Sequence, residues 1–135
     1  MKDAVPEDLF PAGFADEIGV ELLDLSPDGA RARIGVERRH LQPYGIVHGG
    51  VHASLAESLA STATYMAVRD DDMVVMGQAN DTSFLRPITE GNINALAVAR
   101  HRGSTTWIWD VEITDDEGRL CALSRMTIAV RPARA

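Results

Sequence analysis

The residues best suited to do chemistry lie together between positions 42 and 61. A helix is predicted to begin there at Gly49 and Gly50, with no Ser, Thr, Asp or Asn next to them to cap its first N–H groups. Those N–H groups need an acceptor, and glycine has no side chain that would keep a ligand away. The helix start could therefore bind a developing oxyanion. The plainer interpretation is that glycine is itself an adequate N-cap and that water satisfies the remaining groups.

A single carboxylate follows within the same helix. Glu57 is the one Asp, Glu, Lys or Arg between Arg39 and Arg69, and it lies about two turns into a helix whose alanines indicate close packing. A carboxylate in such surroundings is costly unless it is paired or functional, so Glu57 could act as a nucleophile or as the base that activates water. Ser61, four residues on, could hydrogen-bond to it from the same face. The competing interpretation is a glutamate on an exposed stripe of the helix.

Two histidines near the helix start have the spacing of metal ligands, because His48 and His52 are four residues apart. His48 precedes the two glycines, however, so helical geometry between the histidines is not assured. A third ligand is also missing, since Glu57 falls on another face of the helix. We therefore expect no metal site, a hydrogen-bonding role for His48 near the helix start, and structural packing for His52.

The patterns around this segment predict an α+β fold. A segment rich in Ala, Leu, Ser and Met, without proline, predicts a helix over residues 50–69, and Ser26-Pro27-Asp28-Gly29 predicts a hairpin turn. A further turn is expected near residues 89–91. Strands joined by tight turns pair antiparallel, so the helix has a single sheet to cover. Alternating and β-branched patterns predict strands over residues 17–25, 29–37, 73–86, 92–102, 104–114 and 119–130.

Length and charge exclude several classes of protein. The 135 residues suit one domain, expected to span residues 1–135, and 20 acidic against 13 basic side chains give a net charge of −7. That balance argues against a nucleic-acid binder, which needs an excess of Lys and Arg. No apolar run is long enough to cross a membrane. The one cysteine, Cys121, cannot form an intrachain disulfide, so we expect a cytoplasmic protein.

A set of motifs extends over nearly the whole chain. Its residues are Gln42, Pro43, Gly45, His48, Gly49, Gly50, Glu57 and Ser61, then Phe84-Leu85-Arg86-Pro87, Glu90-Gly91, Trp107 and Asp115-Asp116-Glu117-Gly118-Arg119. Together these motifs resemble the hotdog-fold acyl-CoA thioesterases of the PaaI-like superfamily. The most similar branches act on aryl-CoA esters: the glutamate-type 4-hydroxybenzoyl-CoA thioesterases, the 1,4-dihydroxy-2-naphthoyl-CoA thioesterases and the enterobactin-pathway proofreading enzymes. A sister branch has Asp at the position of Glu57.

The resemblance implies a fold and an assembly. The fold is one long central helix wrapped by a five- to six-stranded antiparallel sheet. Two subunits join their sheets edge to edge, with the active site at the seam. A homodimer is then the minimal active unit, and a tetramer built as a dimer of dimers is the expected assembly.

The resemblance also implies a reaction, the hydrolysis of an aromatic or medium-chain acyl-CoA to the free acid and coenzyme A. The amide of Gly49 or Gly50 would polarise the thioester carbonyl, and Glu57 of the partner subunit would attack it or activate water. Ser61 would help to hold that water. A covalent intermediate, the acyl group and the pathway all stay open. The implied catalytic residues are Gln42, His48, Gly49, Gly50, Glu57 and Ser61.

Coenzyme A binding is expected on the later strands. Residues 86–135 carry 7 Arg against 6 acidic side chains, so this part of the chain is not acidic. No cofactor is expected, because coenzyme A is part of the substrate. The alternative function is a non-catalytic acyl-CoA-binding or regulatory hotdog protein, and the alternative reading of each arginine is a solvated strand residue. The implied coenzyme A ligands are Arg86, Arg102, Ser104, Thr105 and Arg134, with Arg100 as an electrostatic helper.

Overall fold

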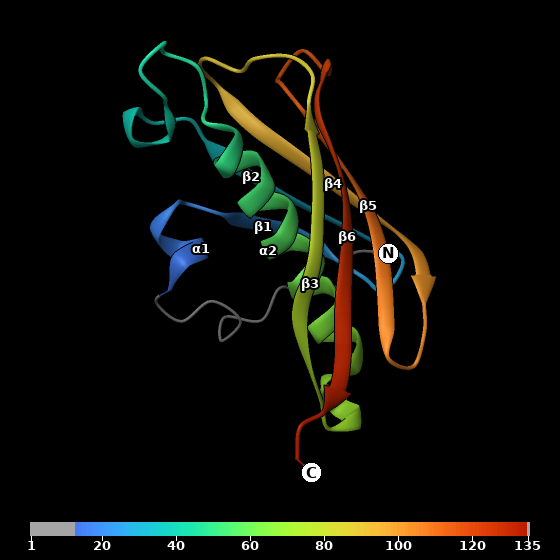
Figure 1. Cartoon of the computed structure of the whole chain (residues 1–135). Helices are drawn as coiled ribbons and strands as arrows, with labels where there is room; N and C mark the ends of the chain where they lie inside the picture. The colour runs from blue at the N-terminus through green and yellow to red at the C-terminus, as the bar shows by residue number, and fades with distance from the viewer. Residues whose placement is uncertain (1–12, 135) are drawn as a thin grey trace.

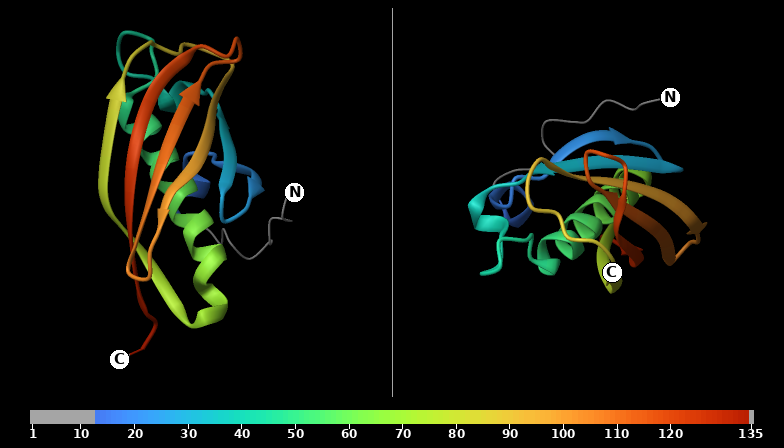
Figure 2. Two further views of the ribbon diagram at one scale, coloured as in Figure 1. Left: turned by 90° about the vertical axis from the view of Figure 1, so that its right-hand side faces the viewer. Right: turned by 90° about the horizontal axis from the view of Figure 1, so that it is seen from above.

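One long helix and one antiparallel sheet make up most of the structure, a computed structural model that describes residues 13–134. The sheet lies along one side of the helix and curves around it, as Figure 1 and Figure 2 show. This arrangement confirms the expected α+β hotdog fold, with six strands in the sheet. In chain order the elements are α1 (Phe14–Glu17), β1 (Glu21–Leu25), β2 (Gly29–Gly35), η2 (Arg38–His40), α2 (Gly49–Val68), η3 (Arg69–Asp71), β3 (Met73–Phe84), β4 (Asn92–Arg102), β5 (Thr106–Thr114) and β6 (Leu120–Pro132).

The central helix α2 follows its sequence pattern closely. Leu55, Leu59 and Ala63 recur at spacings of four residues, and each is at most 1% exposed. Ala56 and Ala60 are fully buried beside them, and their small side chains let the helix lie close to the sheet. The other side chains of α2 are mostly half-buried, and Glu57 is exposed. No helix in the described part of the chain is long and apolar enough to span a membrane.

The strand order in the sheet is β1-β2-β4-β5-β6-β3, and every neighbouring pair is antiparallel. The turn expected near residues 89–91 therefore does not pair its two flanking strands. Instead β3 pairs with β6, from Met73 opposite Pro132 to Phe84 opposite Ala122. A turn signal in the sequence predicts a reversal of the chain, but the pairing partner depends on contacts between distant residues.

Other element boundaries differ only slightly from the prediction. The first strand begins at Glu21 rather than at residue 17, because α1 occupies Phe14–Glu17. The hairpin between β1 and β2 is confirmed: the Ser26 amide donates to the Gly29 carbonyl at 3.0 Å, and the Gly29 amide donates to Ser26 Oγ at 3.1 Å. Cys121 is buried, and this burial raises the pKa of its thiol.

A hydrogen-bonded pair joins the helix to the sheet inside the core. Trp109 of β5 is fully buried, and its Nε1–H donates to Thr64 Oγ1 of α2 at 2.8 Å. The Thr64 hydroxyl donates in turn to the Ala60 carbonyl at 2.7 Å. Trp107 packs on the same side of β5, with its ring centroid 6.0 Å from that of Trp109. Both tryptophans therefore serve the core.

Replacing Thr64 with Val is expected to destabilise the protein by about 1–3 kcal/mol, because the Trp109 N–H would remain buried without an acceptor. Val keeps the size of the side chain, so lost packing contributes little. Urea unfolding measures the change. Thr62→Val, at a half-buried position of the same helix, is the control and should change stability by less than about 0.5 kcal/mol. If both substitutions destabilise the protein equally, the hydrogen bond from Trp109 to Thr64 does not contribute as assigned.

Candidate functional site

The first turn of α2 is capped by His48, which confirms the hydrogen-bonding role expected for this residue near the helix start. His48 is the N-cap residue, and its Nδ1 accepts the Gly50 amide at 2.8 Å. The Val51 amide donates to the His48 carbonyl at 2.9 Å. The Gly49 amide makes no hydrogen bond to another described residue. Of the two glycines that were expected to polarise a carbonyl, Gly49 is therefore the one whose amide is open, while that of Gly50 is occupied.

Phe84, at the end of β3, lies over this helix start. A Cβ atom added to Gly49 would come within 2.9 Å of the Phe84 ring atoms Cε1 and Cζ. Only glycine therefore allows the ring to approach so closely. The Phe84 side chain is nevertheless 57% exposed, so the ring lies between the helix start and solvent.

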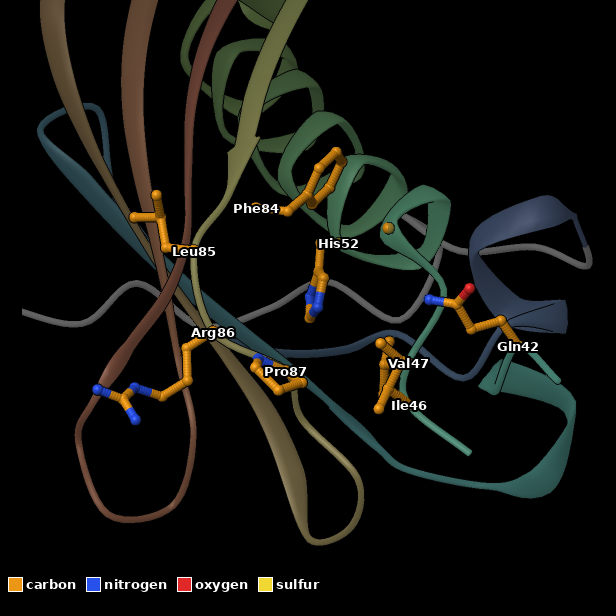
Figure 3. Close-up of a pocket in the computed structure, with 9 residues that line it drawn as sticks. Gln42, Ile46, Val47, His52, Phe84, Leu85, Arg86 and Pro87 are labelled. Carbon is orange, nitrogen blue, oxygen red and sulfur yellow. The ribbon is translucent and has the colours of Figure 1, made fainter. Parts of the chain in front are cut away.

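A cavity of about 450 Å³ opens beside the helix start. Its walls come from the 42–49 segment, the first turn of α2 and the chain that follows β3 (Figure 3). The first and last of these segments are joined by a hydrogen bond from the Val47 amide to the Ile88 carbonyl at 2.8 Å. Most side chains that line the cavity are apolar, so the cavity is suited to hold an apolar group. The lining residues are Gln42, Ile46, Val47, Gly49, His52, Phe84, Leu85, Arg86 and Pro87.

A tight turn holds Gln42 at the rim of this cavity. The Gly45 amide donates to the Gln42 carbonyl at 2.9 Å, and the Gln42 amide donates to the Ile46 carbonyl at 2.8 Å. Gly45 adopts a φ of 84°, which glycine accepts without strain. In Figure 3 the carboxamide of Gln42 points toward the cavity, whereas the Arg86 guanidinium points away from the other lining side chains. Gln42 and Gly49 thus line the same cavity.

Glu57 lies elsewhere, on the face of α2 that meets β3. Its side chain is exposed, which agrees with the competing interpretation of a glutamate on an exposed stripe of the helix. Asn80 of β3 donates from Nδ2 to Glu57 Oε1 at 3.3 Å and to the Ala53 carbonyl at 2.9 Å. A Cβ atom on Gly77 would come within 2.8 Å of Glu57 Oε2. Glu57 is therefore placed by β3.

The hydrogen-bond partner of Glu57 differs from the one expected from the sequence. Ser61 is half-buried and makes no hydrogen bond to Glu57 in the described structure; Asn80 supplies the partner instead. The sequence offered little signal for Asn80, because a polar residue on a strand usually faces solvent. Glu57 borders a second hollow of about 330 Å³, lined by Phe14, Gly50, Ala53, Ser54, Glu57, Ser58 and Asn80.

The expected catalytic residues are consequently divided between two places in one chain. Gln42 and Gly49 line the apolar cavity, and Glu57 borders the hollow on the other side of the helix start. Gly49 and Glu57 are separated by about 12 Å along the helix axis. The described chain alone does not bring the Glu57 carboxylate to the Gly49 amide.

His52 is the buried polar residue of the cavity. Its side chain is 3% exposed, its Nδ1 has no hydrogen-bond partner, and its ring centroid is 6.2 Å from that of Phe84. Burial lowers the pKa of His52 to about 4, so the imidazole is neutral at pH 7. The helical spacing in the sequence could have indicated that His52 is buried, because it shares the buried face of α2 with Ala56 and Leu59.

The expected coenzyme A ligands are also divided. Arg86 lies beside the start of β6, where its amide donates to the Cys121 carbonyl at 3.1 Å. Thr105 lies near the far end of β6, where its carbonyl accepts the Val130 amide at 2.9 Å. These two points on β6, Cys121 and Val130, are nine residues apart, which corresponds to about 30 Å along the strand. Ser104, Arg102 and Arg134 belong to the far end with Thr105, as the strand register and the Ala133–Asp72 hydrogen bond indicate.

Some of these polar side chains already have partners. Arg102 pairs with Asp28 at 2.6 Å, and Arg100 pairs with Asp110 at 3.4 Å. Both arginines are exposed, so neither ion pair excludes a ligand. Within residues 13–134, no three His, Cys, Asp or Glu side chains gather in a way that could hold a metal ion.

Comparisons with known proteins identify the family of this chain. Residues 44–122 match the thioesterase superfamily. The chain is 36% identical over 115 residues to the proofreading thioesterase EntH of Cronobacter turicensis, covering 85% of this chain and 83% of that protein.

Two solved structures share the fold over almost the whole chain. A thioesterase from Pseudomonas aeruginosa, solved as a glutamine-to-alanine variant, superimposes with a TM-score of 0.89 at 31% identity, covering 97% of this chain and 98% of that one. A thioesterase from Haemophilus influenzae gives a TM-score of 0.90 at 28% identity, covering 99% and 96%. This chain therefore belongs to the thioesterase superfamily and is a thioester hydrolase with the hotdog fold.

Proposed function

We propose that this enzyme hydrolyses an aromatic or medium-chain acyl-CoA ester to the free acid and coenzyme A. The observation that carries the proposal is the open Gly49 amide at the rim of an apolar cavity. The cavity suits an acyl group, and the amide suits the thioester oxygen at its end. No further cofactor takes part, because the coenzyme is a portion of the substrate.

The helix start supplies the electrophilic half of the mechanism. When a nucleophile adds to the thioester carbon, negative charge develops on the carbonyl oxygen. The Gly49 N–H at the N-terminus of a 20-residue helix can stabilise that charge, and the helix dipole adds to the effect. Gln42 supports the same oxygen from the rim, while His48 acts indirectly by capping Gly50 and shaping the turn.

Glu57 supplies the nucleophilic half. Its carboxylate either adds to the thioester carbon or removes a proton from a water molecule that adds instead. In both routes the C–S bond breaks, and the thiolate of coenzyme A leaves and takes up a proton. In the first route a water molecule then cleaves the acyl–Glu57 anhydride, which releases the free acid and restores the carboxylate. Ser61 is then a candidate for holding the hydrolytic water, although Asn80 is the residue that holds the carboxylate.

A second copy of the chain would complete the site. β3 lies at one edge of the sheet, and its outer edge has no strand partner among residues 13–134. Pairing of two β3 edges would bring Glu57 of one subunit toward the cavity of the other, because β3 is the strand that holds Glu57. The same assembly would let Arg86 and the Arg102–Thr105 turn act on one coenzyme from different subunits. We therefore propose a homodimer as the active unit and a dimer of dimers as the full assembly.

Glu57→Gln should lower kcat/KM by roughly 10²–10⁴-fold, because the amide cannot act as a nucleophile or a base. Glu57→Asp should also be poor, since its carboxylate is one methylene shorter and the reacting geometry is strict. The activities of both variants are measured as thiol release from benzoyl-, dihydroxynaphthoyl- and aliphatic CoA esters. The control is Glu90→Gln, an exposed glutamate in the segment before β4. Full activity of Glu57→Gln would refute the assigned role.

Complementation between subunits tests the shared site. Gln42→Ala and Glu57→Gln are each expected to have little activity. In an equal mixture that is unfolded and refolded together, half of the dimers contain both variants and each has one intact site. The mixture should regain about a quarter of wild-type activity. If the site lies within one chain, the mixture will show only the average of the two residual activities.

Gly77→Ala should lower kcat while leaving the fold intact. The new methyl group would displace the Glu57 carboxylate, which is the flexible end of its side chain. Misplacing a reacting group by about 1 Å can reduce the rate about 100-fold. The control is Gly35→Ala, a strand glycine whose added Cβ would meet its nearest atom at 3.8 Å. Unchanged kcat in Gly77→Ala, or an equal loss in Gly35→Ala, would contradict this placement.

A further inference from the structure

The apolar cavity contains a polar group that the proposed reaction does not use. His52 is 97% buried, and within residues 13–134 its Nδ1 has no hydrogen-bond partner. His52 makes neither a hydrogen bond nor an ion pair with the described residues.

Burial of such a group normally requires a partner. A polar side chain that is removed from water without a hydrogen bond destabilises the folded protein, and an apolar side chain could have filled the same space. The neighbouring positions on this face of α2 are apolar, as Leu55, Ala56 and Leu59 show. The imidazole is neutral, so it carries one donor and one acceptor nitrogen for an uncharged partner.

The ring of His52 points into the cavity (Figure 3). It is three residues beyond Gly49, about 4.5 Å further along the helix axis. The two other polar side chains of the lining do not compete for this place. Gln42 lies at the rim near the helix start, and the Arg86 guanidinium points away. The remaining walls near His52 are apolar, including Phe84 and Pro87.

We infer that His52 is a specificity-determining residue whose imidazole hydrogen-bonds an uncharged polar substituent, such as a hydroxyl, on the acyl group. The inference builds on the proposed function, because it places the thioester carbonyl at the Gly49 amide and the body of the acyl group along the cavity. A hydroxyl both donates and accepts, so it can pair with either tautomer of the ring. A carboxylate or an ammonium group would be left uncompensated in these apolar walls.

The consequence is a preference among acyl groups of similar size. An ester that carries the hydroxyl satisfies the imidazole, whereas one that lacks it leaves the imidazole buried without a partner. One neutral hydrogen bond corresponds to a preference of about tenfold. Because the contact lies away from the reacting carbon, it should act on KM and leave kcat nearly unchanged.

The test compares benzoyl-CoA with 3- and 4-hydroxybenzoyl-CoA in the wild type, His52→Phe and His52→Gln. The wild type should prefer at least one hydroxylated ester by about tenfold in kcat/KM. His52→Phe, which keeps a ring but no hydrogen-bonding atom, should lose that preference through a higher KM for the hydroxylated ester alone. His52→Gln keeps a hydrogen-bonding amide and should retain part of the preference. His101→Gln, at an exposed histidine of β4, is the control.

The same preference should appear in binding without turnover. In the Glu57→Gln background, calorimetry should show about tenfold tighter binding of the hydroxylated ester, and His52→Phe should abolish the difference. An equal loss for both esters in His52→Phe, or a preference that survives it, would overturn the inference. If binding shows the preference but no ester is hydrolysed, the proposed function fails and the role of His52 stands. If all esters are hydrolysed without a preference, the role of His52 fails alone.

Discussion

Close contact between α2 and the inner face of the curved sheet is the constraint on which the rest of the structure depends. Ala56, Ala60 and Ala63 on the buried face of the helix are at most 1% exposed, and their small side chains let the helix lie close to the sheet. The Trp109–Thr64 hydrogen bond can form only at this separation. Once the rotation of the helix is set by this contact, the directions of His52 and Glu57 are set as well.

The rotation of α2 directs Glu57 away from the apolar cavity that His52 lines. His52 turns toward the apolar cavity, and Glu57 turns toward β3, where Asn80 and the space above Gly77 receive its carboxylate. A helix cannot present residues on such different faces to one small ligand within a single chain. The separation therefore gives a physical reason for a site shared between subunits, which family resemblance alone had suggested.

Local patterns predicted most of the fold, and contacts between distant residues account for what they missed. The helix and its buried stripe follow from residues within a few turns of each other, and so does the β1–β2 hairpin. The pairing of β3 with β6 does not, because it joins residues about 40 or more positions apart. For the site, the sequence indicated Gln42 and Gly49, which line one cavity. The exposure of Glu57, its contact with Asn80 and the division of the coenzyme A ligands depend on how the elements pack.

The cavity also shows how the substrate range of such an enzyme can change. Its two outer walls are tied together through backbone atoms, where the Val47 amide meets the Ile88 carbonyl at 2.8 Å. Any residue with an N–H at position 47 can make that bond, whatever its side chain. The backbone hydrogen bond that joins the two walls is thus independent of the side chains that line the cavity. Substitutions at exposed lining positions such as Phe84 and Leu85 can alter the shape of the cavity without refolding its walls. If the cavity holds the acyl group, as we propose, evolution can change selectivity in small steps while the scaffold stays constant.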